Sequence, residues 1–256
     1  VGINLFSLDK YVQLLMNNSY TVVLVEQVSP PPEPDRKVTS IYSPGTTINY
    51  ITKGDTSNLM VIYIENVKNM KTMKNNINIG ISVVDLSIGK TVVYETYSKK
   101  DDQKYSLDET FRFIQLYDPK EIVIYTNSSD ITETELVSYL ELNNRVVHFK
   151  KDADKQFTNL NYQKSFLEKV YPERGLLSVI EYINMEFHTY SLISFVIALE
   201  FAYKHNEEII KKLEKPELCN NNSHFVLTNN SLQQLNIFNN STQTKTNFNK
   251  FNSLFG

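Results

Sequence analysis

A cluster of prolines near the start of the chain constrains its local fold more than any other feature. The four residues are Pro30, Pro31, Pro32 and Pro34. Each fixes its φ angle and has no backbone N–H to donate, so the chain must leave any sheet here and form an extended, polyproline-like loop. The segments on the two sides of this loop are therefore expected to be separate elements.

Strand-type segments flank the proline loop on both sides. Residues 22–25 are mainly β-branched and have no helical period, which predicts a strand buried on both faces. Residues 37–42 alternate polar and apolar side chains and predict a half-buried strand, which Pro44 and Gly45 end in a turn. With a helix expected over residues 7–18, residues 1–50 predict a partial α+β unit.

The next part of the chain predicts a sheet. Residues 59–64 form a short apolar run, and residues 79–85 and 91–97 read as a β-hairpin in which Gly89 supplies a positive φ. Ser106, with Glu109 three residues later, is the pattern of a helix N-cap, and it predicts a helix through residue 117.

Helices and strands then alternate. Residues 121–126 predict a buried strand, residues 132–142 a helix capped by Thr132 and Glu135, and residues 146–149 a further strand. A hairpin followed by such alternation is typical of an α/β layout with parallel later strands. A three-strand meander followed by crossovers is also the order of the ribonuclease H-like fold.

From residue 161 onward the hydrophobic period is helical. Residues 163–170, 175–187 and 190–213 predict successive helices, the last of them apolar nearly all round at its start. The expected fold class is therefore α/β: a ribonuclease H-like domain over residues 51–160, with a mixed sheet and flanking helices. The partial α+β unit precedes it, and an all-α segment over residues 161–256 follows.

Composition excludes several classes of function. A formal charge of −3, spread evenly along the chain, leaves no polycationic arm for nucleic acid. The single cysteine, Cys219, allows no internal disulfide and no Cys-rich metal site. Without a signal peptide or an apolar stretch of membrane-spanning length, we expect a soluble, intracellular protein with no membrane partner. The abrupt ends of the pattern predict an internal fragment of a longer chain.

Asp85 is the strongest candidate for catalysis because it ends a strand just before a glycine turn. Ribonuclease H-like nucleases place a metal-binding Asp on their first strand, but two-metal hydrolysis needs further carboxylates at the same point. Other carboxylates are present without motif spacing: Glu109, Asp130, Asp152 and Asp154. The favoured interpretation is a hairpin turn residue, with a metal-dependent nuclease as the alternative. The scattered histidines, His148, His188, His205 and His224, do not predict a metal site.

The order of the segments resembles the DNA mismatch-repair MutS family. In that family a helix, a strand, an excursion and a second strand ending in Ser-Pro-Gly-Thr close the mismatch-recognition domain. The matching positions are Glu26, Gln27, Arg36, Pro44, Gly45 and Thr46. A leucine-spaced stretch over residues 227–237 and the start of an apolar segment at residues 253–256 match the beginning of the family's core. The Pro-rich loop and the Asn, Lys and Ile content are most similar to a branch from large DNA viruses.

The resemblance implies a function for a longer parent protein. The parent would be a DNA-dependent ATPase that binds mismatched double-stranded DNA as a homodimer, with ATP and Mg bound outside this fragment. Residues 51–160 would be the connector that couples nucleotide state to the DNA clamp, through joints at residues 50–57 and 151–159. The fragment itself would have no catalytic, cofactor or metal residues. Two alternatives stay open: a nuclease that uses Asp85, and a non-enzymatic interaction module that uses the proline loop as a polyproline ligand.

Overall fold

The structure is a computed structural model, and it describes most of the first 219 residues. The described residues are 2–30, 32, 34–46, 58–68, 75–126, 131–143, 145–151, 155–205, 207, 210 and 213–219. The chain divides into two units, Val1–Cys219 and Asn220–Gly256. The predicted leucine-spaced stretch and the apolar segment at residues 253–256 belong to the second unit and lie outside the described residues.

The chain begins with a helix and a two-stranded hairpin. A short 3-10 helix, η1 (Leu5–Ser7), leads into α1 (Leu8–Asn17), and β1 (Val22–Gln27) pairs antiparallel with β2 (Arg36–Tyr42). The base of the proline loop is closed, because the amide of Val28 donates to the carbonyl of Asp35 at 2.9 Å. The predicted elements are confirmed.

The predicted burial of β1 on both faces is wrong. Val23 is 50% exposed and Val25 is 51% exposed. Within the described residues β1 is part of a two-stranded sheet, so its side chains are not enclosed between two layers. A β-branched run favours an extended backbone whether or not the strand is covered, so it could not by itself predict burial.

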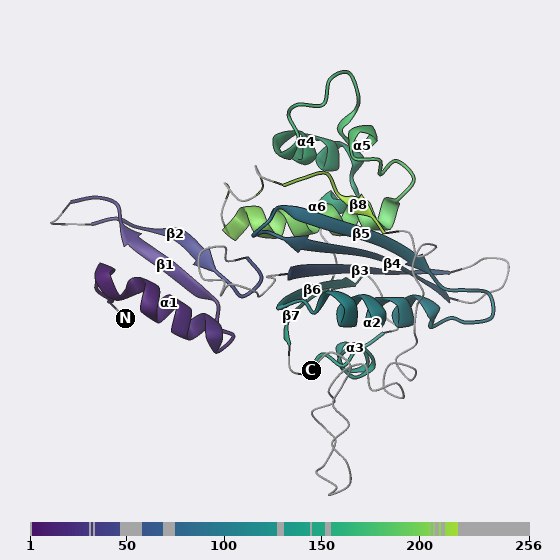
Figure 1. The fold of residues 1–256 in the computed structure, drawn as a ribbon, viewed down its shortest axis with the longest axis horizontal. Helices are drawn as coiled ribbons and strands as arrows, with labels where there is room; N and C mark the ends of the chain where they lie inside the picture. Colours follow the sequence, from purple (N-terminus) through teal and green to yellow (C-terminus); the bar gives the residue numbers. More distant parts are fainter. Residues whose placement is uncertain are drawn as a thin grey trace, which may run out of the picture. The chain divides into compact units, whose positions relative to one another are not determined.

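A six-stranded mixed sheet forms the centre of the first unit (Figure 1). Its order is β7-β6-β3-β4-β5-β8, and its strands are β3 (Asn58–Lys68), β4 (Asn75–Asp85), β5 (Lys90–Tyr97), β6 (Glu121–Thr126), β7 (Val146–Lys151) and β8 (Glu217–Leu218). The first three form an antiparallel meander, while β6 and β7 add to β3 in parallel. This is the predicted ribonuclease H-like order, and Gly89 has the predicted positive φ, 77°.

Two helices cover one face of the sheet. They are α2 (Tyr105–Tyr117) and α3 (Glu133–Tyr139) (Figure 1). Their apolar side chains share a buried cluster with Met60, Ile62 and Ile64 of β3. The capping box of Thr132 and Glu135 is confirmed. The predicted cap at Ser106 is wrong, because the carbonyl of Lys104 already accepts the first helical bonds and Ser106 is fully buried.

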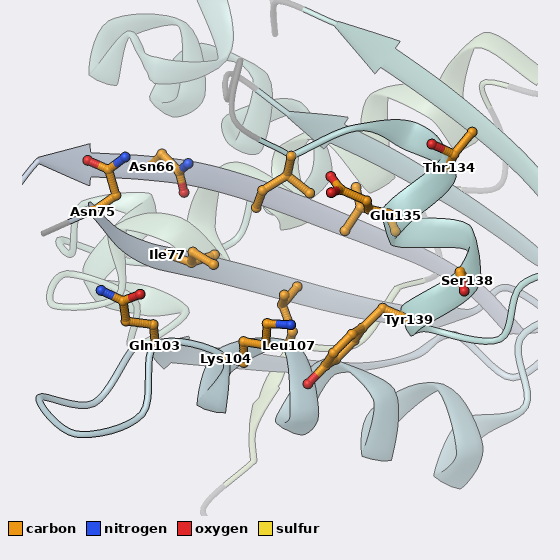
Figure 2. Close-up of a pocket in the computed structure, with 12 residues that line it drawn as sticks. Asn66, Asn75, Ile77, Gln103, Lys104, Leu107, Thr134, Glu135, Ser138 and Tyr139 are labelled. Atoms are coloured by element: carbon orange, nitrogen blue, oxygen red, sulfur yellow. The ribbon is translucent and has the colours of Figure 1, made fainter.

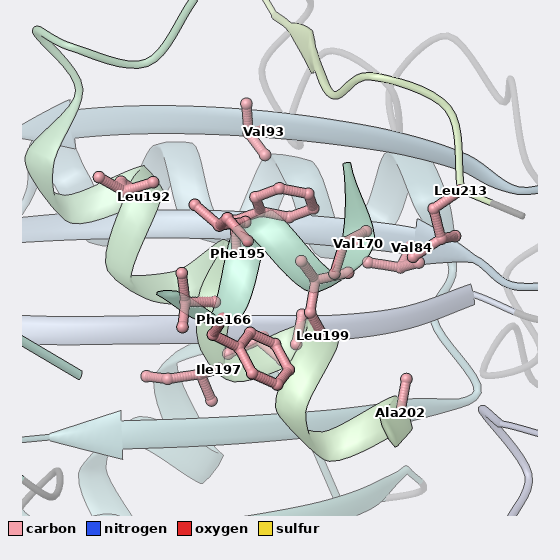
Figure 3. Packing of buried hydrophobic residues seen from close by; sticks show 14 of the residues in the cluster. Val84, Val93, Phe166, Val170, Leu192, Phe195, Ile197, Leu199, Ala202 and Leu213 are labelled. Atoms are coloured by element: carbon pink, nitrogen blue, oxygen red, sulfur yellow. The ribbon is translucent and has the colours of Figure 1, made fainter. Parts of the chain in front are cut away.

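The opposite face of the sheet is covered by α6 (Thr189–His205), which contacts β3, β4 and β5. Figure 3 shows Phe195 and Leu199 of this helix in the same apolar cluster as Val84 and Val93 of the strands. This enclosure explains why the helix is apolar nearly all round. Before it come η2 (Lys155–Thr158), α4 (Leu160–Val170) and α5 (Val179–Tyr182).

The helices in this region differ in length from the predictions. The segment at residues 175–187 is helical only over α5, because Gly175 at φ 64° precedes it and Asn184 at φ 59° follows it. The helix predicted over residues 190–213 is α-helical over Thr189–His205 in the described residues. The expected division at residue 160 stays a prediction, although the packing of α6 and β8 on the sheet extends the first unit across it to Cys219.

The first turn of α6 packs directly on β4. A Cβ added at Gly80 would lie 1.9 Å from the carbonyl oxygen of Tyr190, so only glycine allows this approach. Beside it the hydroxyls of Ser82 and Ser194 are 2.7 Å apart, and the carboxylate of Glu95 accepts the free backbone amides of Tyr190 and Ser191.

We expect Gly80→Ala to destabilise the protein by about 3 kcal/mol or more, because the backbone of α6 would have to move away from the sheet. Urea unfolding followed by circular dichroism measures the change. Gly2→Ala is the matched control, since nothing lies within 4 Å of the position of its added Cβ. A Gly80→Ala protein as stable as the control would contradict this account of the packing.

Candidate functional site

A buried carboxylate at the start of β6 gathers three hydrogen-bond donors. Oε2 of Glu121 accepts from the hydroxyl of Ser43 at 2.6 Å and from the amide of Gly45 at 2.9 Å. Oε1 of Glu121 lies 2.7 Å from Nε2 of His148, which donates to it. Glu121 is fully buried, and we refer to Glu121, His148 and the turn at residues 43–46 as the joint.

The register of β6 and β7 brings the side chains of Glu121 and His148 together. In the parallel pair of β6 and β7, Glu121 is opposite Val146 and Val123 is opposite His148. Alternate residues of a strand share a face, so Glu121, Val123 and His148 all lie on the same face of the sheet. Val123 belongs to the apolar cluster of α6, and the ring of His148 lies 6.0 Å from that of Phe201 on α6.

The turn that follows β2 is shaped to fit this carboxylate. The amide of Thr46 donates to the carbonyl of Ser43 at 3.1 Å, and the hydroxyls of the two residues are 2.7 Å apart. Both residues are buried. A Cβ at Gly45 would lie 2.7 Å from Cβ of Glu121 and 3.4 Å from Cβ of Leu59, so the turn can approach only with glycine at this position.

The charge of Glu121 is stabilised by its neighbours. Burial alone would raise the pKa of Glu121, but the hydrogen bonds from His148, Ser43 and Gly45 outweigh burial and hold the pKa below its ordinary value. The carboxylate is therefore ionised at neutral pH. Because the side chain of His148 is 35% exposed, the joint is open to solvent on that side.

The structure places the six motif positions at two ends of the hairpin. Pro44, Gly45 and Thr46 lie in the turn of the joint. The sequence predicted that Pro44 and Gly45 end the strand in a turn. At the other end of β2, Arg36 pairs with Gln27, next to the pair of Lys37 with Glu26. The two groups are separated by the length of β2, roughly 20 Å for seven residues.

Sequence reasoning missed the two sheet residues of the joint. Glu121 was interpreted as the start of a buried strand, and His148 as one of several scattered histidines. A signal was present, because a charged residue at the start of the otherwise apolar segment Glu-Ile-Val-Ile-Tyr-Thr requires a partner once that strand is buried.

Asp85 occupies a hairpin turn. Its carboxylate accepts from the backbone amide and the hydroxyl of Ser87, and its carbonyl accepts from the amide of Gly89 at 2.9 Å. It ends β4, the second strand of the meander, and not the first. Over the described part of the chain no group of three or more His, Cys, Asp or Glu residues could hold a metal ion.

The other carboxylates weighed for a nuclease are not placed with Asp85. Glu109 lies on α2, where it pairs with Arg112 and accepts from the hydroxyl of Tyr94. Asp130, Asp152 and Asp154 lie outside the described residues. The geometry around Asp85 supports a turn and gives it no described metal partner.

A pocket of about 560 Å³ lies between α2, α3 and the ends of β3 and β4 (Figure 2). Its lining includes the apolar side chains of Ile77 and Leu107 and amide side chains such as that of Gln103. Its charged lining residues are Lys104 and Glu135, and the carboxylate of Glu135 is already engaged in the cap of α3. The ammonium of Lys104 lies 5.2 Å from the centre of the Tyr139 ring, which also lines the pocket.

None of the helices in the described part of the chain combines the length and the apolar character that a membrane-spanning helix requires.

Acid should weaken the joint. Because the folded pKa of Glu121 lies below its unfolded value of about 4.5, its contribution to stability is complete above that pH and is lost as the pH falls through the folded pKa. We expect the free energy of unfolding of the wild type to fall more steeply below pH 4.5 than that of Glu121→Gln. Urea unfolding at a series of pH values measures both slopes.

The control is Glu135→Gln. The pKa of Glu135 is also lowered, by hydrogen bonds in the cap of α3, but this residue is exposed. Solvent screens such a group, so its removal should flatten the profile less than removal of Glu121. Equal slopes in the wild type and Glu121→Gln would contradict the assigned role of the carboxylate.

We expect the purified chain not to cleave branched DNA or RNA–DNA hybrids with Mg²⁺, and Asp85→Asn to behave like the wild type. The reason is that Asp85 is engaged in its own turn. Gel assays on labelled substrates test this, with Glu217→Gln as a surface control. Mg²⁺-dependent cleavage that Asp85→Asn abolishes would establish the nuclease alternative.

Comparison with known proteins finds relatives in one family. The family described as MutS domain I matches residues 1–50. A MutS homologue of Acanthamoeba polyphaga mimivirus is 32% identical over 92% of this chain and 23% of its own length. The DNA mismatch repair protein MutS of Caldanaerobacter subterraneus subsp. tengcongensis is 25% identical over the whole chain and 26% of its own length.

A solved structure was also found, the Holliday junction resolvase of fowlpox virus, with 11% identity and a TM-score of 0.31. It covers 57% of this chain and 99% of its own. The chain spans about a quarter of the length of the two MutS relatives. The family match at the N-terminus and the relatives that align along nearly all of the sequence lead to one conclusion: the chain belongs to the MutS family of DNA mismatch repair proteins.

Proposed function

We propose that this chain is the connector portion of a mismatched-DNA-binding ATPase, and that it couples the nucleotide state of the parent protein to its DNA clamp. One observation carries the proposal. The turn that closes the segment matching MutS domain I is buried on the ribonuclease H-like sheet through the carboxylate of Glu121. In the proposal this polar contact joins the recognition segment to the connector sheet.

The joint gives such coupling a mechanical basis. β2 ends at Tyr42, and the next residue, Ser43, already donates to Glu121. A movement of the sheet therefore displaces the end of β2 without an intervening flexible stretch. Such a contact favours transmission between two sites when both states of the protein differ at the joint.

The other parts of this function belong to the parent protein. The 256 residues contain no Gly-x-x-x-x-Gly-Lys-Ser/Thr phosphate loop. Among the described residues no group of three or more His, Cys, Asp or Glu side chains could hold a metal ion. In the proposal ATP and Mg bind elsewhere in the parent, which acts as a homodimer on mismatched double-stranded DNA. Two loops were expected from the sequence to allow movement during coupling. Residues 50–57 lie outside the described residues, and residues 151–159 include η2.

The full-length parent should hydrolyse ATP faster with a mismatched duplex than with a matched duplex of the same length. In Gly45→Ala the added Cβ would displace the turn from Glu121, so we expect the mismatch stimulation to fall by about fivefold or more while basal hydrolysis persists. Steady-state phosphate release measures both rates, with Gly2→Ala as the control. A parent protein with no DNA-dependent ATP hydrolysis would exclude the proposed function.

A further inference from the structure

We propose that Glu121 is a reversible latch, which releases the turn at residues 43–46 while the sheet stays folded. The inference rests on the proposed coupling function, and it assigns the movable element of that coupling to one carboxylate. In the latched state the turn is held by two donors on Oε2 of Glu121. Glu121 is thus a positioning residue for the segment that matches MutS domain I.

The two oxygens of the Glu121 carboxylate bind different partners. Oε2 accepts both donors of the turn, from Ser43 and Gly45, while Oε1 accepts from His148. The turn can therefore leave without breaking the bond to His148. The charge of Glu121 would still have a hydrogen-bond donor after release, which avoids the large cost of an unpaired buried carboxylate.

The sheet does not depend on the turn for its own pairing. Glu121 is held in the ladder on both sides, opposite Leu59 of β3 and Val146 of β7. Two residues further along β6, Val123 is fully buried in the apolar cluster that includes residues of α6. Opening of the turn would leave these contacts in place, so it is a local event and not an unfolding of the unit.

His148 sets the orientation of the latch. Its ring is packed near Phe201, whose own ring lies 4.4 Å from that of His205 near the end of α6. A ring held in this way directs Nε2 at Oε1 and leaves Oε2 facing the turn. The two charged or titratable side chains of the joint are then Glu121 and His148, and the turn contributes only neutral donors.

The amide of Thr46 reports on the latch. It is buried and donates within the turn to Ser43, so it exchanges with solvent only when the turn opens, and it does not bond to Glu121 itself. Ile62, in the middle of β3 between β4 and β6, reports on unfolding of the sheet. Native-state hydrogen exchange of the 256-residue chain, followed by NMR at increasing low urea, compares the two amides.

We expect Thr46 in the wild type to exchange faster than Ile62 and with little dependence on urea, as local opening does. Glu121→Ala should speed exchange at Thr46 by about tenfold or more, because the turn loses two charge-assisted hydrogen bonds. The exchange rate at Ile62 should change only as far as the free energy of global unfolding changes. The matched control is Glu200→Ala, which removes a buried carboxylate of α6 that bonds to Tyr162 and Lys204. It should leave the exchange rate at Thr46 unchanged, while Ile62 follows any change in the free energy of global unfolding.

A wild-type Thr46 that exchanges as slowly as Ile62, with the same urea dependence, would overturn the latch, because the turn would then open only when the whole unit unfolds. This measurement needs no variant, so it holds even where Glu121→Ala fails to fold. It also needs neither ATP nor DNA. Failure of the latch therefore shows in hydrogen exchange, and failure of the proposed function shows in the parent's ATP hydrolysis.

Discussion

The burial of β3 on both faces is the constraint on which the rest of the structure depends. Leu59, Val61 and Tyr63 face the α6 side, while Met60, Ile62 and Ile64 face α2 and α3. A central strand of this kind must be paired on both edges, and β4 and β6 supply the partners. Since the parallel register sets Leu59 opposite Glu121, the same pairing fixes the carboxylate at the point where the turn of residues 43–46 arrives.

Two features set by neighbouring residues were predicted correctly from the sequence. The β4–β5 hairpin depends on a positive φ at Gly89, and the start of α3 depends on a capping box of two residues three positions apart. In contrast, the exposure of β1 and the extent of α5 depend on what packs against them or on backbone breaks such as Asn184. Local periodicity carries no information about packing partners or backbone breaks. The predicted burial of β1 was therefore wrong, and the helix predicted at α5 was too long.

The candidate site shows the same division. The turn residues Pro44, Gly45 and Thr46 were found because Ser-Pro-Gly-Thr ends a strand in a recognisable way. The requirement for glycine at position 45 nevertheless comes from Glu121, 76 residues away in the sequence. A single sequence gives the spacing within the turn but not the partner across the fold. Glu121 and His148 could be identified only when the strand register was known.

A carboxylate at this point of the sheet does something that an apolar residue could not. An apolar side chain at position 121 would add to the cluster around Val123, and replacement of buried polar groups by apolar ones is often neutral or stabilising. It would, however, hold any apolar segment equally well. The carboxylate instead accepts only donors in one arrangement, the hydroxyl of Ser43 and the amide of Gly45. Its charge therefore favours specificity of docking over maximal stability, which is the property that the proposed coupling needs.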